Sequence, residues 1–295
     1  VVVEELTIRK RTELLETLGD SLRLAYAPKV REEAIALLVE RAGFPITFLS
    51  GGALSMGRYG SPDMGLVTAS EVAQAVAVIR DRIAIPLIVD ADTGFGNALT
   101  LQRSLRAFER AGASAVQIED QGFPKRCGHM AGKTVVPLAE SVGRIRAALD
   151  ARHDMLVIAR TDALAVEGYD AAIERAEAYL DAGADLIFIE GPRTLSELEG
   201  IAGRFAGRVP LVHNLVEGGV TPVDNGAALE QLGFAIALHP LLLLHGLAAH
   251  GPRWLDTLAR ERGTASLSAD IARLSDINAL LGASDLIDLG KRYDA

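Results

Sequence analysis

Residues 87–120 read LIVDADTGFGNALTLQRSLRAFERAGASAVQIED, and this stretch predicts the architecture of the chain. A short run of branched apolar residues, 87–90, is followed by an amphipathic segment, 98–111, and then by a second apolar run, 115–119. Asn97 precedes the amphipathic segment and is a good N-cap for a helix. Strand, helix and strand in this order form the unit from which parallel sheets are built.

The same alternation of short apolar runs and amphipathic segments continues along most of the chain. Gly112 and Gly183 each stand where a helix is expected to stop before a strand. Another helix is expected to begin after Thr68, which precedes Glu71. The pattern therefore repeats one strand-helix unit. The expected strands are residues 22–26, 46–50, 87–90, 115–119, 156–160, 186–190, 211–214 and 235–238.

About eight such units in fewer than 300 residues, without a linker or a break in composition, predict an α/β protein that forms a (β/α)8 TIM barrel. An open doubly wound sheet is the alternative, but no complete glycine-rich dinucleotide fingerprint follows an early strand. We expect a single domain over residues 1–295, with the barrel at about 20–262. Extra C-terminal helices are expected at about 263–295.

The composition of the 295 residues narrows the function. Hydrophobic residues make up 49% of the chain, which is enough for a large core. The formal net charge of -9 argues against a nucleic acid or an anionic membrane as partner, because such partners need a basic surface. The single cysteine excludes an intrachain disulfide, and the chain shows no signal-peptide pattern or long apolar span. These features predict a soluble cytoplasmic protein that acts on a small molecule.

Polar residues fall at the carboxyl ends of the predicted strands, where the active sites of TIM barrels lie. Burying an unpaired charge in such a crowded place is costly, so each charged group needs a partner. For any single one of these residues, a structural ion pair is as good an explanation as a functional site. The residues are Ser50, Gly51, Gly52, Asp90, Asp92, Glu119, Arg160, Asp162, Glu190 and Asn214.

Four acids near this end of the barrel predict a metal site, because like charges repel unless a cation lies among them. Their oxygens favour Mg2+, with Mn2+ as the natural substitute, and Mg2+ usually takes only one or two direct carboxylate ligands. Zinc is less favoured, because the spacing of His213 and His239 matches no compact zinc pattern. The four acids are Asp63, Asp90, Asp92 and Glu119.

The only cysteine, Cys127, lies in a loop that contains glycine, and cations surround it in the sequence. Lys125, Arg126 and His129 would lower the thiol pKa from its usual value of about 8.5. A buried structural cysteine is the alternative. The loop position favours a catalytic acid or base, because loops on a rigid scaffold often carry the chemistry.

These motifs together resemble the isocitrate lyase and phosphoenolpyruvate mutase superfamily. The similarity covers most of residues 36–245, in the expected order. The cysteine loop resembles the lyase branch, which includes methylisocitrate lyase, dimethylmalate lyase and oxaloacetate hydrolase. A carboxyphosphonoenolpyruvate mutase has a similar loop, so phosphonomutase chemistry stays open. The matching stretches are 50–52, 89–97, 119–121, 125–129, 159–163, 189–190 and 214–222.

The resemblance implies a Mg2+-dependent carbon-carbon lyase. It would cleave a 2-hydroxy di- or tricarboxylate into a 2-oxo acid and a second carboxylate. Asp90 would bind the metal directly, whereas Asp63, Asp92 and Glu119 would hold its waters. A barrel that only binds ligands is disfavoured, because the residues for catalysis are all present.

The resemblance also implies roles around the substrate. The amides of residues 50–52 and the fork of Arg160 would bind the oxo-acid portion. Cys127 would protonate the second fragment, on a mobile lid of residues 122–133. The implied catalytic residues are Cys127, Lys125, His129, Arg160 and Glu119. The implied substrate-binding residues are Phe48, Ser50, Gly51, Gly52, Gly128, Arg160, Glu190 and Asn214.

Three departures from the family pattern leave the exact substrate open. Phe48 stands where methylisocitrate lyases typically have a tyrosine, and in this respect the chain resembles dimethylmalate lyase. Residues 28–32 replace a Pro-Gly-Ala-Tyr-Asp-like turn before the first helix, and His239 replaces a frequent tyrosine. The resemblance further implies a homotetramer, a dimer of dimers that exchange their C-terminal helices.

Overall fold

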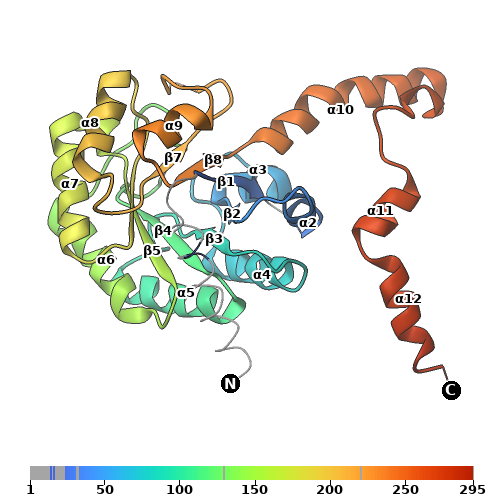
Figure 1. Cartoon of the computed structure of the whole chain (residues 1–295), viewed down its shortest axis with the longest axis horizontal. Coiled ribbons are helices and arrows are strands. Elements are labelled where there is room, and N and C mark those ends of the chain that lie inside the picture. Colours follow the sequence, from blue (N-terminus) through green and yellow to red (C-terminus); the bar gives the residue numbers. More distant parts are fainter. Residues whose placement is uncertain are drawn as a thin grey trace. The chain divides into compact units, whose positions relative to one another are not determined.

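The computed structural model describes Leu14, Glu16 and residues 24–30, 33–128, 130–219 and 221–294. The chain divides between Leu241 and Leu242 into two compact units. The first unit holds the strands and the helices around them (Figure 1). The second unit already begins with α10 (Leu242–Glu261), about twenty residues before the sequence places the start of the C-terminal extension.

Eight parallel strands form one sheet, in the order β6-β5-β4-β3-β2-β1-β8-β7. A parallel bridge between Ile187 and Leu211 links β6 to the residues before β7, so the sheet is nearly closed. This confirms the predicted (β/α)8 TIM barrel. The strands are β1 (Ala25–Val30), β2 (Thr47–Leu49), β3 (Leu87–Asp90), β4 (Ala115–Glu119), β5 (Leu156–Thr161), β6 (Leu186–Ile189), β7 (Val212–Asn214) and β8 (Ile236–His239).

Several helices of the first unit begin where the sequence supplies caps. Thr68 and Glu71 form a reciprocal capping box, and the Asn97 side chain accepts hydrogen bonds at the start of the next helix. Gly112 ends that helix with a φ of 102°, a conformation that favours glycine. The helices are α2 (Glu33–Arg41), α3 (Gly51–Tyr59), α4 (Ala69–Arg80), α5 (Ala98–Ala111), α6 (Leu138–Ala151), η1 (Ala163–Ala165), α7 (Tyr169–Asp181), α8 (Leu195–Phe205) and α9 (Gly226–Leu232).

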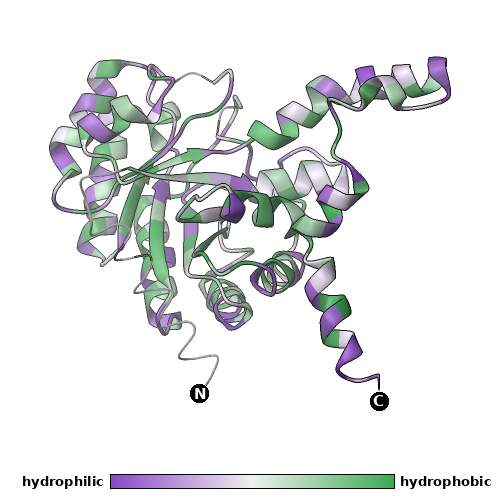
Figure 2. Ribbon diagram, turned by 45° about the vertical axis from the view of Figure 1, so that its right-hand side comes forward, coloured by the Kyte–Doolittle hydropathy of each residue, from purple (hydrophilic) through white to green (hydrophobic). Residues whose placement is uncertain are grey.

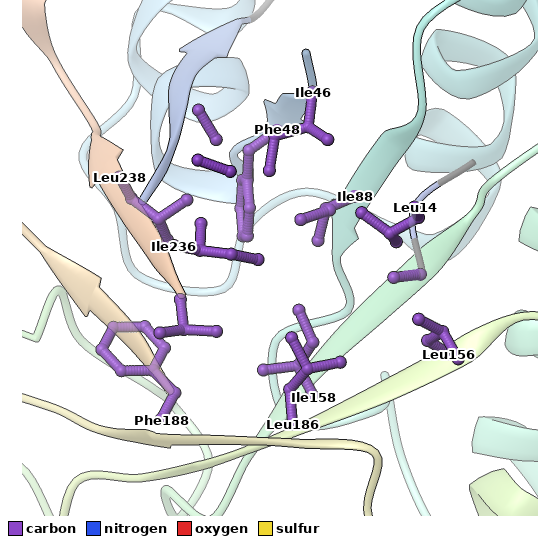
Figure 3. Packing of buried hydrophobic residues seen from close by; sticks show 14 residues of the cluster. Leu14, Ile46, Phe48, Ile88, Leu156, Ile158, Leu186, Phe188, Ile236 and Leu238 are labelled. Carbon is purple, nitrogen blue, oxygen red and sulfur yellow. The ribbon is translucent and has the colours of Figure 1, made fainter. Parts of the chain in front are cut away.

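Apolar side chains fill the interior of the barrel. Figure 3 shows side chains from several strands packed together there, and Figure 2 shows the largely hydrophobic strands in green. Phe48, Ile88, Ile158, Phe188 and Ile236 come from five different strands, and all are fully buried. Because the interior is filled, a ligand can bind only at an end of the barrel.

The first strand corrects the sequence prediction. It runs from Ala25 to Val30 instead of residues 22–26, and residues 22 and 23 lie outside the described part of the chain. Lys29 pairs in register with Phe48, so the strand continues through Pro28, where a turn was expected. Pairing with β2 on one side and β8 on the other outweighs the local turn signal of proline. Lys29 therefore stands at the carboxyl end of a barrel strand.

The second unit consists of helices with exposed apolar side chains. After α10 come η2 (Ala265–Leu267), α11 (Leu274–Leu280) and α12 (Ala283–Lys291). Large apolar residues such as Leu255, Leu274 and Leu286 are more than half exposed. In the part of the chain that the structure describes, no helix has both the length and the apolar character needed to span a membrane.

Candidate active site

The polar strand ends converge on one cavity at the carboxyl end of the barrel. Met56, Val216, Pro240 and Leu241 form its apolar edge. Cys127 reaches the same cavity from the loop that follows β4. The predicted site residues that line it are Ser50, Gly52, Asp63, Asp90, Glu119, Lys125, Cys127, Gly128, Arg160, Glu190 and Asn214.

The turn at Ser50 brings a helix N-terminus against the acids. Ser50 caps α3, and its side-chain oxygen accepts a hydrogen bond from the Ala53 amide at 3.2 Å. The Gly51 amide donates to Asp90 Oδ2 at 3.2 Å. A Cβ atom on Gly52 would lie 2.9 Å from Asp63 Oδ2, so glycine is needed for this close approach. Amides and a helix N-terminus in this position suit an anionic ligand.

Three aspartates and one lysine pack together beside this turn. Asp90 Oδ1 accepts hydrogen bonds from the Asp92 amide at 3.2 Å and from Gln117 Nε2 at 3.3 Å. Lys125 Nζ lies 2.5 Å from Asp63 Oδ1 and 2.7 Å from Asp92 Oδ1. One ammonium group thus lies between two carboxylates, and Asp92 stands behind the residues that line the cavity.

The buried acids outnumber the positive charge near them. Burial raises the pKa of Asp92 to about 7, although Lys125 opposes this rise. Burial also raises the pKa of Glu119 well above its usual value, against the effect of Arg160. For Lys125, burial opposes ionisation, but Asp92 and Glu119 outweigh it and raise the pKa. Because burial disfavours the charged forms of these acids, a cation bound beside them would stabilise their carboxylates.

The donor set fits a hard divalent cation. All the candidate ligands are carboxylate oxygens, which Mg2+ prefers. Glu119 Oε1 is buried and has no hydrogen-bond partner among the described residues. Within that same part of the chain, no three His, Cys, Asp or Glu side chains converge into a ready-made metal cage. Such a site suits Mg2+, which keeps several of its waters and needs few direct protein ligands.

Buried carboxylates hold Arg160 on the other side of the cavity. Its Nε and Nη2 atoms donate to the two carboxylate oxygens of Asp162 at 2.9 and 3.1 Å. Glu119 and Glu190 lie 3.4 and 3.5 Å from the guanidinium group. Asn214 Nδ2 donates to Glu190 Oε2 at 2.8 Å. The guanidinium plane is therefore fixed before a ligand arrives.

Gln121 fixes the start of the cysteine loop. Its side chain donates to the Arg126 carbonyl at 2.9 Å and accepts from the Arg126 amide at 3.0 Å. The Gly122 amide donates to the Thr134 carbonyl at 2.8 Å, which joins the two ends of the loop. Cys127 lies between these anchors and is partly exposed.

The tip of this loop touches the arginine side of the cavity. A Cβ atom on Gly128 would lie 2.5 Å from Arg160 Nη2 and 2.9 Å from the Glu190 side chain. Lys133 Nζ donates to the Gly128 carbonyl at 2.5 Å and to Asp162 Oδ1 at 2.8 Å. The loop therefore brings Cys127 to the same cavity as Arg160 and the acids.

Asp120 follows Glu119 in sequence but belongs to a different network. It accepts hydrogen bonds from Thr161 Oγ1 at 2.6 Å, the Asp162 amide at 2.9 Å and the Tyr179 hydroxyl at 2.8 Å. Asp120 is buried and does not line the cavity. This acid joins β4 to β5 and α7.

Several predicted residues lie away from the cavity lining. Phe48 is fully buried in the barrel core. His213 packs edge-on against Phe234, with ring centroids 5.5 Å apart, and His239 Nδ1 lies 3.6 Å from a Glu217 oxygen. Neither histidine is among the described residues that line the cavity, and His129 lies outside the described part of the chain.

Two lysines in the site escaped the sequence analysis. Lys29 lines the cavity from β1, and Lys133 contacts Asp162 and the cysteine loop. A charged residue at the end of the apolar run 24–30 is the signal that could have revealed Lys29. No local signal marks Lys133, because its partner Asp162 follows β5, far away in the sequence.

Comparison with known proteins identifies the family. The family model described as phosphoenolpyruvate phosphomutase matches residues 15–249. The chain belongs to this family. It is 36% identical to 2,3-dimethylmalate lyase of Eubacterium barkeri over 289 residues, which are 97% of this chain and 98% of that protein. It is 44% identical to 2-methylisocitrate lyase of Aeropyrum pernix over 228 residues, 77% of this chain and 73% of the relative.

Solved structures agree with this family membership. A crystal structure of 2,3-dimethylmalate lyase, a member of the phosphoenolpyruvate mutase and isocitrate lyase superfamily, matches with a TM-score of 0.90 and 31% identity, over 96% of this chain and 95% of that one. Phosphonopyruvate hydrolase in complex with oxalate and Mg2+ matches with a TM-score of 0.86 and 32% identity, over 97% and 99% of the two chains. The superfamily that the motifs indicated is confirmed.

Proposed function

We propose that this family member is a Mg2+-dependent carbon-carbon lyase. It cleaves a branched 2-hydroxy di- or tricarboxylate into a 2-oxo acid and a second carboxylate. The observation that carries the proposal is that one cavity brings together acids suited to a metal, an anion-binding turn and Cys127. Relatives named 2-methylisocitrate lyase and 2,3-dimethylmalate lyase support the same reaction class.

Asp90 is the proposed direct ligand of Mg2+, because three neighbouring groups fix its carboxylate beside the Ser50 turn. Asp63, Asp92 and Glu119 would hold waters of the metal. Bound there, Mg2+ would stabilise the negative charge that develops on the oxygen of the 2-oxo acid. Lys125 keeps Asp63 and Asp92 oriented.

The chain's own groups bind and orient the substrate. The amides of the Ser50 turn, at residues 50–52, bind the carboxylate of the 2-hydroxy acid. Arg160 binds the same portion through its fixed guanidinium group, while Glu190 and Asn214 shape the pocket beside it. Because Arg160, Glu190 and Asn214 are already paired with one another, these side chains need little reorganisation on binding.

Cys127 is the proposed proton donor. The substrate hydroxyl gives its proton to the Glu119 carboxylate, which lines the same cavity, and the carbon-carbon bond breaks. The electron pair of that bond stays on the carbon of the second fragment, and the thiol protonates that carbon. Lys125 and His129 tune the charge around the thiol, and the loop closes over the substrate and excludes water. In the synthetic direction the thiolate removes the same proton.

A substrate panel tests this proposal. Release of a 2-oxo acid is measured with 2-methylisocitrate, 2,3-dimethylmalate and oxaloacetate in the presence of Mg2+. We expect release from at least one of the first two and none in excess chelator. Oxalate and acetate from oxaloacetate would indicate a hydrolase instead. A phosphorus-carbon product from a phosphonate substrate, detected by phosphorus NMR, would indicate a mutase.

The metal ligand has its own test. Asp90→Ala should abolish the Mg2+-dependent release, because it removes the one carboxylate that is proposed to bind the ion directly. Isothermal titration with Mg2+ alone should show weaker binding by this variant. Activity of the wild type that is unchanged in chelator would remove the metal from the mechanism.

The proposal includes the assembly and the place of action. A homotetramer that exchanges its C-terminal helices would cover the exposed leucines of α10, α11 and α12. Sedimentation velocity measures the assembly state directly, and a monomer at micromolar concentration would contradict it. The proposed place of action is the cytoplasm.

A further inference from the structure

Lys29 is a buried cation that the proposed chemistry does not use. It is only 8% exposed and lines the same cavity as Ser50 and Arg160. Its register with Phe48 places it at the carboxyl end of β1. The ammonium group lies 4.4 Å from the centroid of the Phe48 ring.

The other cations that line the cavity are already bound within the protein. Lys29 differs from them, because no carboxylate in the described part of the chain lies within ion-pair distance of its ammonium group. The partners of the others are Asp63 and Asp92 for Lys125, Asp162 for Arg160 and the Ala131 carbonyl for Arg126.

An ammonium group in this position favours an anionic ligand. Burial lowers the pKa of Lys29, and Asp90 opposes this shift, while Arg160 adds to it. Contact with the face of an aromatic ring stabilises a cation only modestly, which offsets only part of the cost of burial. A carboxylate that enters the cavity would supply the missing partner.

The groups already assigned to the substrate leave Lys29 as an additional positive charge in the cavity. The proposed function assigns the 2-hydroxy acid end of the substrate to Asp90, the Ser50 turn and Arg160. Lys29 comes from a different strand, β1, which pairs with β2 and β8. It is therefore a positive group in addition to those that bind the 2-hydroxy acid end.

We propose that Lys29 binds a carboxylate on the fragment that leaves as the second product, so that the protein prefers a 2-hydroxy tricarboxylate to a 2-hydroxy dicarboxylate. This inference rests on the proposed lyase function. The Phe48 ring contacts the ammonium group and carries no negative charge that would compete with an anionic ligand. Position 48 thus carries a phenylalanine without a hydroxyl, and the lysine on the neighbouring strand lies over its ring.

The test compares two substrates in two variants. Lys29→Met keeps the length and apolar stem of the side chain but removes the charge, whereas Lys29→Arg keeps the charge. With Mg2+ present, kcat/KM is measured for 2-methylisocitrate, which has three carboxylates, and for 2,3-dimethylmalate, which has two. We expect Lys29→Met to lower the kcat/KM for 2-methylisocitrate, relative to that for 2,3-dimethylmalate, about 10- to 100-fold. The change should come mainly from the KM of the tricarboxylate. Lys29→Arg should restore part of the ratio.

Inhibition by product-like probes separates binding from folding. Succinate carries the additional carboxylate and propionate lacks it, while oxalate probes the 2-oxo acid end. Lys29→Met should weaken inhibition by succinate and leave inhibition by propionate and oxalate unchanged. Lys291→Met, at an exposed position of α12, is the matched control and should change none of these values.

The outcomes distinguish the two proposals. An unchanged substrate ratio in active Lys29→Met, or an equal loss for both substrates, would overturn the role of Lys29 while the lyase function stands. Wild-type protein that releases no 2-oxo acid from either substrate would overturn the proposed function, and the Lys29 proposal with it. Inhibition by oxalate in each variant verifies that the site is folded.

Discussion

Glu119 and Asp120 are adjacent acids at the end of β4, yet their surroundings differ sharply. Glu119 lines the cavity, and one of its oxygens has no hydrogen-bond partner among the described residues. Asp120 accepts four hydrogen bonds from groups on β5, α7 and the residue after β5. A buried acid with satisfied oxygens serves the fold, whereas one with an unsatisfied oxygen is available to a ligand.

This contrast explains why a family motif of consecutive acids can combine two tasks. Neighbouring residues at a strand end face different sides, so one side chain reaches the cavity and the next reaches the layer of helices. The Asp120 network ties together the strand ends that carry Glu119 and Arg160. The hydrogen bonds of Asp120 thus stabilise the strand ends that hold Glu119 and Arg160 in place.

Removing Asp120 should give the largest effect on stability. Asp120→Ala leaves the Thr161 and Tyr179 hydroxyls and the Asp162 amide without their acceptor, each at a cost of about 1–3 kcal/mol. We expect the free energy of unfolding to fall by about 3 kcal/mol in urea denaturation. The same stability as the wild type would show that the network does not support the fold.

Changing Glu119 should reverse this pattern. Glu119→Gln has nearly the same shape, and burial already raises the pKa of the acid, so we expect little loss of stability. The rate of 2-oxo acid release should fall roughly 100-fold, as for other groups that hold metal-bound water. A variant that lost stability as Asp120→Ala does, while keeping its activity, would contradict the assignment of the two roles.

A surface acid should give the smallest effect. Hydrogen bonds from Arg208 and then Arg204 lower the pKa of Glu177 from 4.5 to about 2. Because the folded-state pKa is depressed, the stabilisation is present above pH 4.5 and is lost as the pH falls towards 2. Both arginine side chains are about half exposed, so solvent weakens the interaction.

The measurement is the difference in the free energy of unfolding between the wild type and Glu177→Gln. We expect a small difference in the free energy of unfolding at pH 7, and a smaller one in high salt. Near pH 2 the difference should be almost gone. A difference that grew as the pH fell would contradict the sign of the shift. Arg253→Gln, which removes an exposed ion pair with Asp270 in the second unit, is the matched control.

The sequence predicted the fold best where local signals and packing agree. The strands at 87–90 and 115–119 and the helix starts at Thr68 and Asn97 match the structure. The first strand was misplaced, because the local signal of Pro28 indicates a turn. Pairing with strands far away in the sequence decides its position instead.

The candidate site followed from one rule, that polar strand ends meet at one end of a barrel. This rule identified the acids, Arg160 and Asn214. All of them line the cavity with Cys127 except Asp92 and Asp162, which pair with Lys125 and Arg160. It could not identify Lys133, which lies in a loop and whose partner Asp162 is far away in the sequence. Lys29 was missed for a different reason, because it was placed in a turn and not at a strand end.

The most direct test of the central claim compares the wild type with Cys127→Ser in one assay, the release of 2-oxo acid from the active substrate with Mg2+. The account predicts that the variant loses at least about 100-fold in kcat, as expected for removal of a general acid, while its binding of Mg2+ and oxalate stays nearly unchanged. Retention of most of the activity by Cys127→Ser would contradict the role of the thiol as proton donor.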